Sequence, residues 1–352
     1  MKHLAIRADG NSEIGYGHLV RTGVLAQKFL KYNHQVTYLT RTPSTVSDTC
    51  PNEIDIYQLG ENEIKDTLRW LEEVAPDVLL TDSYNVDTEY QKRLADSASL
   101  LVTITDDTRF TLCSDVNING NVHGPVLDYE WVGEKPDMLL GTDYLLMREE
   151  FQQLADKAPP WRDSPDRALV TFGGSDMNNT TPDVIRAFDG FGVVVDVIIG
   201  PGFTNKDKIQ KAARGTDAEF NLLEDPDNLP QLMFNADFAV SAGGSTVYEL
   251  LLTGTPVIGI PQSENQVRII EGLWKKNAVL PVKIDTGKAF NSIRSSTNPQ
   301  LLDVDSSSLI RQLKPNIKKV INDAQFRYGL HDKGLSLVDG KGDARIYERL
   351  AS

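Results

Sequence analysis

The sequence has 352 residues, too many for one typical core, and its ordinary apolar (40%) and charged (24%) contents indicate a globular protein of two domains. Its net charge of −14 argues against binding to nucleic acid or to an anionic membrane, because both need basic surfaces. With no apolar run of membrane-spanning length and no signal-peptide pattern in "MKHLAIRADG", we expect a cytoplasmic protein.

Short apolar segments typical of strands alternate with segments of helical periodicity in the first half of the chain. The strand-like segments are 3–10, 35–42, 77–84 and 100–107, and the helical segments are 17–33, 62–76 and 88–99. This alternation predicts βαβ units and a parallel sheet.

A proline-rich segment, 156–166, separates two such alternations, so we place a domain boundary there. We expect an N-terminal Rossmann-like domain at 1–156, a C-terminal one at 167–332, and a tail with a helix at 333–352 that could pack back on the N-terminal domain. Ligands bind beyond the carboxyl ends of parallel strands. The predicted fold class is therefore α/β, with two parallel-sheet domains facing across a cleft.

Two loops of the second domain each end a buried strand with two glycines and a hydroxyl residue. Glycines let a ligand approach the backbone, and a helix that begins there offers unpaired N–H groups and the positive end of its dipole. The residues that we expect to bind substrate are Gly173, Gly174 and Ser175 in the first loop, and Gly243, Gly244, Ser245 and Thr246 in the second. Neither loop matches the dinucleotide or P-loop pattern, and an ordinary βα turn uses the same residue types.

Polar residues also follow the second loop. Ser245 stands where an N-cap hydroxyl would be expected. Glu249, one turn further, could accept hydrogen bonds from a ribose diol or simply suit the helix dipole. Glu264, Asn265 and Gln266 open the next helix and could meet polar groups of a ligand or cap that helix.

The segment "EIGYGHLVRT" (13–22) lies between the first strand and the first helix. Gly15 and Gly17 let this turn pass close to a substrate, and His18 then lies in the first helical turn. The helix dipole disfavours an imidazolium there, and a neutral imidazole is what a general base requires. Arg21, on the same face, could bind a pyrophosphate or orient a carboxylate. The alternative is that His18 is an ordinary polar residue and Arg21 a solvated charge.

Carboxylates end other strands of the first domain. Asp82 and Tyr84 follow one strand and Asp106 follows the next, although acids at such positions often only cap helices. One carboxylate could orient the imidazole of His18, and the sequence favours Asp82 or Asp9 without deciding between them.

No pair of histidines and no cysteine cluster has the spacing of a metal site, so we expect neither a metal ion nor another cofactor. Cys50 and Cys113 are too few and too far apart for a disulfide framework. His123, in a glycine loop at the carboxyl edge of the sheet, is a candidate for a supporting contact.

Several segments of the chain are recognisable together. In order they are "RADGNSEIGYGHLVRT", "DSYNVD", "TITDD", "NINGN", "LLGTDYLLMREEF", "TFGGSD", "IIGPG", "SAGGSTVYELLLTGTPVIGIPQSENQ" and "GLSLVDGKGDARIYERL". They resemble the UDP-sugar hydrolases of pseudaminic acid biosynthesis, a family that also includes spore-coat polysaccharide biosynthesis proteins. The second glycine loop is similar to the nucleotide site of the MurG-type glycosyltransferases.

The resemblance implies the GT-B architecture, with UDP held by the C-terminal Rossmann-like domain. It implies that water attacks the anomeric carbon of a UDP-linked 2,4-diacetamido-2,4,6-trideoxyhexose without a metal, giving UDP and free sugar for a nonulosonic acid or a surface polysaccharide. The catalytic histidine of the family falls on His18 and its tyrosine on Tyr84. Leucines at 250–252, where the family commonly has arginine or cysteine, and Tyr16, where smaller residues are frequent, leave the sugar open.

Three other functions use the same scaffold. A glycosyltransferase would pass the sugar to a hydroxyl acceptor, and a hydrolysing 2-epimerase would need an acid and a base on both faces of the sugar's C2. A non-catalytic protein would bind the UDP-sugar without turnover. The segment "GYGHLVRT" and the lack of a membrane-docking patch favour the hydrolase. The sequence does not determine the oligomeric state.

Overall fold

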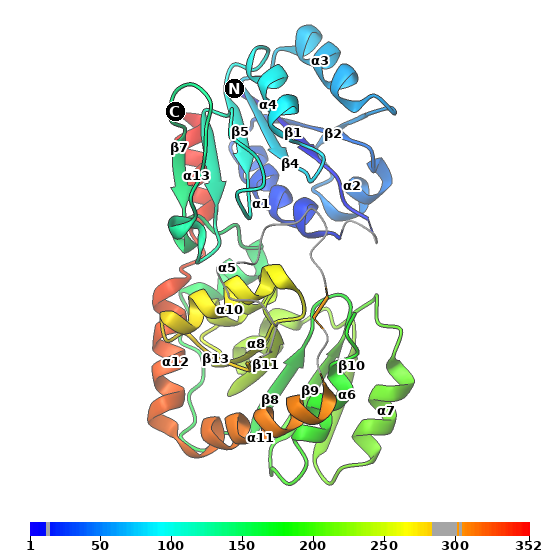
Figure 1. Cartoon of the computed structure of the whole chain (residues 1–352), viewed down its shortest axis with the longest axis vertical. Helices are drawn as coiled ribbons and strands as arrows, with labels where there is room; N and C mark the ends of the chain where they lie inside the picture. The colour runs from blue at the N-terminus through cyan, green and yellow to red at the C-terminus, as the bar shows by residue number, and fades with distance from the viewer. Residues whose placement is uncertain (12–14, 284–300, 303–304) are drawn as a thin grey trace. The chain divides into compact units, whose positions relative to one another are not determined.

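Two compact units make up the computed structural model, which describes residues 1–11, 15–283, 301–302 and 305–352. Unit 1 comprises Met1–Glu149 and Gly340–Ser352, and unit 2 comprises Glu150–Asp339. Each unit is a parallel β-sheet with helices on both faces (Figure 1). The first two letters of "EIGYGHLVRT", at 13 and 14, lie outside the described residues.

Seven parallel strands form the sheet of unit 1, in the order β3-β2-β1-β4-β5-β6-β7, among the residues that are described. The strands are β1 (His3–Ala8), β2 (Gln35–Thr40), β3 (Asp55–Gln58), β4 (Val78–Asp82), β5 (Leu101–Ile104), β6 (Val116–Asn119) and β7 (Asp137–Leu140). The helices are α1 (Gly17–Lys31), α2 (Pro43–Thr49), α3 (Glu63–Val74), α4 (Thr88–Ala95) and α13 (Gly342–Ala351), with 3-10 turns at Gly124–Val126 and Thr142–Tyr144.

Six parallel strands, in the order β10-β9-β8-β11-β12-β13, form the sheet of the described part of unit 2. The strands are β8 (Arg167–Thr171), β9 (Val194–Ile199), β10 (Glu219–Glu224), β11 (Phe238–Ala242), β12 (Val257–Ile260) and β13 (Val279–Pro281). The helices are α5 (Glu149–Ala155, at the division), α6 (Thr181–Ala187), α7 (Lys206–Arg214), α8 (Leu229–Asn235), α9 (Ser245–Leu252), α10 (Glu264–Lys275), α11 (Ser306–Asn322) and α12 (Ala324–Leu337).

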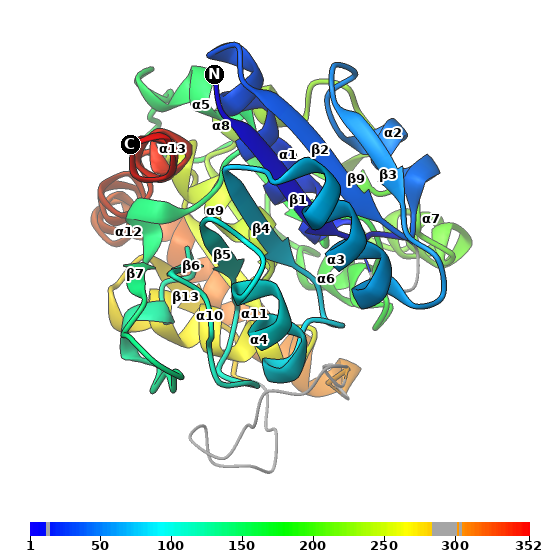
Figure 2. The same ribbon diagram turned by 90° about the horizontal axis from the view of Figure 1, so that it is seen from above.

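The sheet of unit 1 is buried on both faces, which explains the apolar runs of its central strands, at 4–6 in β1 and 78–80 in β4. Leu25 and Phe29 of α1 pack with Ile346 and Leu350 of α13 in the core on one face. Helices α3 and α4 cover the other face, as seen from above (Figure 2), where Trp70 belongs to the core. The strands and helices predicted for the first half of the chain are all present, with ends shifted by a few residues.

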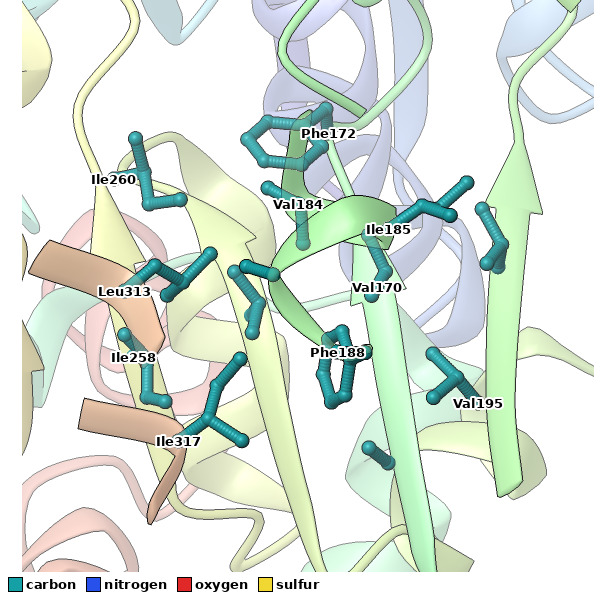
Figure 3. Packing of buried hydrophobic residues seen from close by; sticks show 14 of the residues in the cluster. Val170, Phe172, Val184, Ile185, Phe188, Val195, Ile258, Ile260, Leu313 and Ile317 are labelled. Atoms are coloured by element: carbon teal, nitrogen blue, oxygen red, sulfur yellow. The ribbon is translucent and has the colours of Figure 1, made fainter. Parts of the chain in front are cut away.

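Unit 2 has a core of its own, in which α6, α7 and α11 pack on one face of the sheet. Figure 3 shows Val170 of β8 and Ile258 of β12 with Phe188, which follows α6, and Ile317 of α11. These side chains are fully buried. Burial on this scale is what fixes the strand ends from which the loops of a ligand site project.

The proline-rich segment 156–166 lies inside unit 2 and differs in this respect from the boundary predicted there. Side chains of unit 2 hold it: Arg162 donates to Asp237 (Nη1 to Oδ1, 3.0 Å), and the buried Arg327 donates to the backbone carbonyl of Asp163 (2.9 Å). The chain leaves unit 1 earlier, at Glu149. It returns at Gly340, so that the last helix, α13, packs on α1 within unit 1.

The strand order of each sheet reverses once, between β1 and β4 in unit 1 and between β8 and β11 in unit 2. Loops leave neighbouring strands in opposite directions at such a switch point, which opens a crevice at the carboxyl edge of the sheet. The segment "GYGHLVRT" follows β1, and Asp82 ends β4. The two glycine loops follow β8 and β11. Each unit therefore places its predicted site residues at its own switch point.

Candidate active site

His18 and Asp82 form the centre of the site in unit 1. A turn with Gly15 at φ +89° precedes α1, a conformation that suits glycine. His18 lies in the first turn of α1, and Asp82 is the last residue of β4. Both side chains are buried, and Nδ1 of His18 lies 2.6 Å from Oδ1 of Asp82.

Arg21, one turn further along α1, binds the same carboxylate. Its Nε donates to Oδ2 of Asp82 at 2.6 Å, and its Nη2 to Oδ1 at 2.5 Å. Burial by itself raises the pKa of Asp82, but the charge of Arg21 and the hydrogen bonds from Arg21 and His18 lower that pKa below its ordinary value. Asp82 is therefore an ionised carboxylate that only accepts hydrogen bonds.

The ionised Asp82 determines the tautomer of His18. A carboxylate 2.6 Å from Nδ1 requires the proton on Nδ1, which leaves the lone pair of the neutral ring on Nε2. Nη2 of Arg21 is farther from Nδ1, at 3.2 Å. An imidazole held in this way can take up a proton at Nε2, the arrangement of a general base with an orienting carboxylate.

A second carboxylate binds the other side of Arg21. Nη1 of Arg21 donates to Oδ1 of Asp106 at 2.7 Å, and the Asn121 amide donates to the same oxygen at 2.9 Å. Burial raises the pKa of Asp106, but Arg21 lowers it to well below the ordinary range. Because all three nitrogens of the guanidinium contact carboxylates, the geometry favours orientation of a carboxylate, one of the two roles expected for Arg21, over pyrophosphate binding.

Tyr84 packs against the ring of His18. The ring centroids are 4.6 Å apart, and the planes meet at 82°, an edge-to-face contact. Burial raises the pKa of Tyr84, so its hydroxyl stays protonated near neutral pH and can donate a hydrogen bond. His18, Arg21, Asp82 and Tyr84 together line a small pocket of unit 1.

Asp9 and His123, the other candidates near this edge, lie in different contacts. Asp9 pairs with Arg7 (2.7 Å) and accepts hydrogen bonds from Thr40 and from the backbone N–H of Arg41. Of the two carboxylates considered for His18, Asp82 is the one in contact. Nε2 of His123 lies 3.1 Å from the backbone carbonyl of Asp106, next to the site.

Sequence reasoning missed two residues that line the pocket, Arg109 and Phe110. They follow β5 in the segment "TDDTRF" (105–110), just after the predicted strand end. A cluster of charges with an aromatic residue beyond a strand is the signal that could have identified them. Asn121, which binds Asp106, follows the strand β6, and that strand was hard to recognise because two of its four residues are asparagines.

The site in unit 2 is built from backbone. Gly173 has φ +71°, and a Cβ atom placed on it would lie 3.9 Å from Oγ1 of Thr246, so the two glycine loops are neighbours. The Oε1 atom of Gln266 accepts from the backbone N–H of Gly243 and from that of Gln262, both at 3.0 Å. Gln266 thus ties the start of α10 to the second loop.

Helix α9 begins at this junction. Its N-cap residue is Gly244, which has no side chain to cap the helix, so Ser245 is the first helical residue and not the N-cap expected there. The helix starts one residue earlier than a Ser245 cap requires. The N-cap residue thus supplies no side-chain acceptor at the start of α9, where helix N-termini can bind anions. Glu249 is buried one turn further along.

The remaining predicted residues lie around the two loops. Gly174 and Ser175 are exposed in the first loop. Glu264, in the first turn of α10, is half-buried. The exposed Asn265 accepts a hydrogen bond from the Ser263 hydroxyl at 2.6 Å. The structure therefore gathers the predicted residues of unit 2 at one sheet edge and gathers those of unit 1 at another.

Three searches of the described residues give limits on other roles. No group of three or more His, Cys, Asp or Glu side chains within those residues could hold a metal ion. Among the helices that the structure describes, none combines the length and the apolar character needed to span a bilayer. Cys50 and Cys113 are free thiols.

Known proteins resemble this chain in sequence and in structure. No family model matches the sequence. The Acinetobacter baumannii MurG structure superposes with a TM-score of 0.70 at 12% identity, over 100% of this chain and 99% of that one. The chain has the GT-B fold. The UDP-GlcNAc 2-epimerase of Neisseria meningitidis, bound to UDP-GlcNAc, also matches this GT-B chain, with a TM-score of 0.60 at 12% identity and full coverage of both chains.

Two curated relatives match the GT-B chain at the level of sequence. The spore coat polysaccharide biosynthesis protein SpsG of Bacillus subtilis is 25% identical over 98% of this chain and 96% of its own length. The UDP-2,4-diacetamido-2,4,6-trideoxy-beta-L-altropyranose hydrolase of Campylobacter jejuni is 25% identical over 77% of this chain and 95% of its own. The resemblance to this hydrolase and spore-coat group, predicted from the motifs, is confirmed.

Proposed function

We propose that this protein is an enzyme that hydrolyses a UDP-linked 2,4-diacetamido-2,4,6-trideoxyhexose to UDP and the free sugar. The observation that carries the proposal is the buried His18–Asp82 pair, with Nδ1 and Oδ1 2.6 Å apart, in a pocket of unit 1. A general base with a fixed tautomer is what activation of water requires. The name of the Campylobacter jejuni relative supplies the substrate class.

In the proposed reaction, Nε2 of His18 takes a proton from water as the water oxygen bonds to the anomeric carbon. The bond from that carbon to the diphosphate oxygen breaks, and UDP leaves with the electron pair. The proton then passes from the imidazolium to solvent. Asp82, oriented by Arg21, stabilises the imidazolium while it carries that proton. Tyr84 supports the ring and can donate a hydrogen bond to the sugar.

Unit 2 would bind the nucleotide. Support for this role comes from the paired glycine loops and from α9, whose N-cap residue is a glycine. Such helix starts suit the phosphates of a nucleotide. The buried carboxylate of Glu249 would accept hydrogen bonds from the ribose diol.

We propose, as the family resemblance implies, that no metal ion takes part. Neither glycine loop has the P-loop pattern in which a lysine and a hydroxyl hold a magnesium nucleotide. Activity should therefore survive exhaustive treatment with EDTA. Activity that disappears and returns with magnesium or manganese would contradict the metal-free reaction.

A glycosyltransferase or a hydrolysing 2-epimerase is the alternative on this fold, as its likeness to MurG and to UDP-GlcNAc 2-epimerase indicates. The test is incubation of the protein with UDP-linked diacetamido-trideoxyhexoses in the absence of any acceptor. Equal amounts of UDP and of free sugar, with the sugar identified by NMR, support the hydrolase. UDP release only after an acceptor is added, a product inverted at C2, or binding without turnover would contradict it.

A further inference from the structure

Arg109 lines the same pocket of unit 1 as His18, and the proposed chemistry does not use it. Its Nε and Nη2 donate to Oδ1 and Oδ2 of Asp107, both at 2.8 Å. Its guanidinium carbon lies 4.5 Å from the centre of the Tyr84 ring. A bidentate salt bridge to Asp107 and a cation–π contact with the Tyr84 ring therefore fix the orientation of this guanidinium.

The third guanidinium nitrogen of Arg109, Nη1, does not take part in the salt bridge to Asp107. It is buried, and it has no hydrogen-bond partner among the residues that the structure describes. Buried N–H groups nearly always have a partner, because leaving the bond unmade costs free energy. Since Asp107 and Tyr84 hold the guanidinium from two sides, Nη1 is a fixed donor beside the pocket that His18 also lines.

The charge of the pocket indicates which acceptor Nη1 suits. Two positive and three negative side chains line the pocket, which leaves one net negative charge when His18 is neutral; they are Arg21, Arg109, Asp82, Asp106 and Asp107. A diphosphate would be repelled by this excess of negative charge. A neutral acceptor oxygen would not be repelled, and Asp107 already balances the charge of Arg109.

The rest of the lining suits the uncharged part of a nucleotide sugar. Tyr84 and Phe110 offer aromatic surface next to Arg109 and the polar residues. Sites with a few fixed polar groups among apolar surfaces bind small ligands in one orientation. A deoxysugar with acetamido groups combines apolar edges with carbonyl and hydroxyl oxygens.

We propose that Arg109 is a sugar-binding residue, with Nη1 donating to a neutral acceptor oxygen, an amide carbonyl or a hydroxyl, of the hexose. This inference rests on the proposed function, because it takes the sugar of that substrate as the ligand. It adds a specificity-determining residue for which neither the motifs nor the comparisons gave a role.

Replacement of Arg109 by lysine tests the proposal, because an ammonium keeps the charge but cannot form the planar fork with Asp107 and still present a third nitrogen. Binding is measured by calorimetry in the slow His18→Asn background, so that the intact UDP-diacetamido-trideoxyhexose can be used as the probe. UDP alone is the second probe. Arg69→Lys is the matched control, because Arg69 also contacts an aspartate and a tyrosine, Asp66 and Tyr57, but on the surface of α3.

We expect Arg109→Lys to weaken binding of the UDP-sugar by about tenfold to a hundredfold, the effect of one lost hydrogen bond to a charged donor. Affinity for UDP should not change, and Arg69→Lys should bind both probes as the background protein does. Equal affinity for the UDP-sugar in both proteins would overturn the inference. A parallel loss for UDP and the UDP-sugar would also overturn it, because Arg109 would then act on the nucleotide or on the fold.

This binding experiment separates the inference from the proposed function. If the wild-type protein releases no UDP but the Arg109→Lys difference is found, hydrolysis is wrong and the sugar contact stands. If the wild-type protein hydrolyses the substrate, and Arg109→Lys leaves the affinity for the UDP-sugar unchanged, Arg109 does not contact the sugar and the proposed hydrolase function stands. A role through Tyr84 alone would lower kcat in the His18-containing enzyme and leave the affinity for the UDP-sugar unchanged.

Discussion

The switch points of the two units have the same topology and different chemistry. Between β1 and β4, Asp82 binds His18 and Arg21 in a network of ionisable side chains with hydrogen bonds of 2.5–2.6 Å. Between β8 and β11, glycines and the start of α9, with its glycine N-cap, present backbone groups instead. A parallel sheet thus determines where a ligand can bind, whereas the residues beyond its strands determine whether the site can move protons or only hold a molecule.

Replacing Asp82 should produce the largest difference between the effect on turnover and the effect on UDP affinity. Asp82→Asn removes the charge that fixes the tautomer of His18 and balances Arg21, so we expect turnover to fall by about 10²–10⁴-fold. UDP affinity, which we propose depends on unit 2, should be unchanged. Asp77→Asn is the matched control, because Asp77 lies just before β4, at the opposite end from Asp82, and its carboxylate accepts a hydrogen bond from the backbone N–H of His3 (2.7 Å).

Steady-state kinetics and UDP calorimetry on the two variants provide the measurement, with near-ultraviolet circular dichroism to show that both are folded. A folded Asp82→Asn protein with near-normal turnover would show that the carboxylate does not orient a base.

Replacing Glu249 should have the opposite effect, because it should lower UDP affinity more than turnover. Glu249→Ala removes the proposed acceptor for the ribose diol, and we expect UDP affinity to fall by about tenfold to a hundredfold, as for charge-assisted hydrogen bonds. Turnover at saturating substrate should fall much less. Glu271→Ala, in the neighbouring helix α10, is the control. Calorimetry that finds equal UDP affinity in both variants would remove Glu249 from the nucleotide site.

A Cβ methyl group at Gly200 should displace the first glycine loop, which we propose binds UDP, without contacting a polar side chain. A Cβ atom there would lie 2.5 Å from the carbonyl oxygen of Gly173 and 2.6 Å from that of Gly174. The first glycine loop must then move, so Gly200→Ala should weaken UDP binding by about tenfold. At Gly192 a Cβ atom would meet nothing within 4 Å, so Gly192→Ala is the control. Unchanged UDP affinity in Gly200→Ala would mean that this loop does not bind UDP.

Sequence reasoning succeeded for features that depend on one strand or helix alone. The buried strands β1, β4, β8 and β11 have continuous apolar runs that end in polar or glycine residues, so both switch points could be anticipated. Two strands away from the centres of the sheets were missed for physical reasons. β10 (Glu219–Glu224) is only half-buried, and β6 (Val116–Asn119) contains buried asparagines, of which Asn117 accepts a hydrogen bond from Thr105.

Contacts between elements could not be predicted from the sequence. Both Asp9 and Asp82 end central strands, and only the register of β1 with β4 and the position of α1 decide which carboxylate meets His18. Arg21 contacts a second carboxylate, Asp106, only because of the conformation of the loop after β5, which no local sequence pattern specifies. Arg109 was missed for the same reason, because its contacts with Asp107 and Tyr84 arise from the folding of that loop.

We propose that the imidazole of His18 in unit 1 activates water, whereas binding of UDP depends on unit 2. Turnover and UDP affinity of His18→Asn, measured beside His34→Asn, test it most directly; His34 lies beyond the other end of α1, where its Nε2 contacts the Tyr347 hydroxyl at 2.9 Å. We predict that His18→Asn lowers turnover by about 10²–10⁴-fold with UDP affinity unchanged, and that His34→Asn leaves both close to wild type. Near-normal turnover in His18→Asn, or a loss of UDP affinity in step with turnover, would contradict the claim.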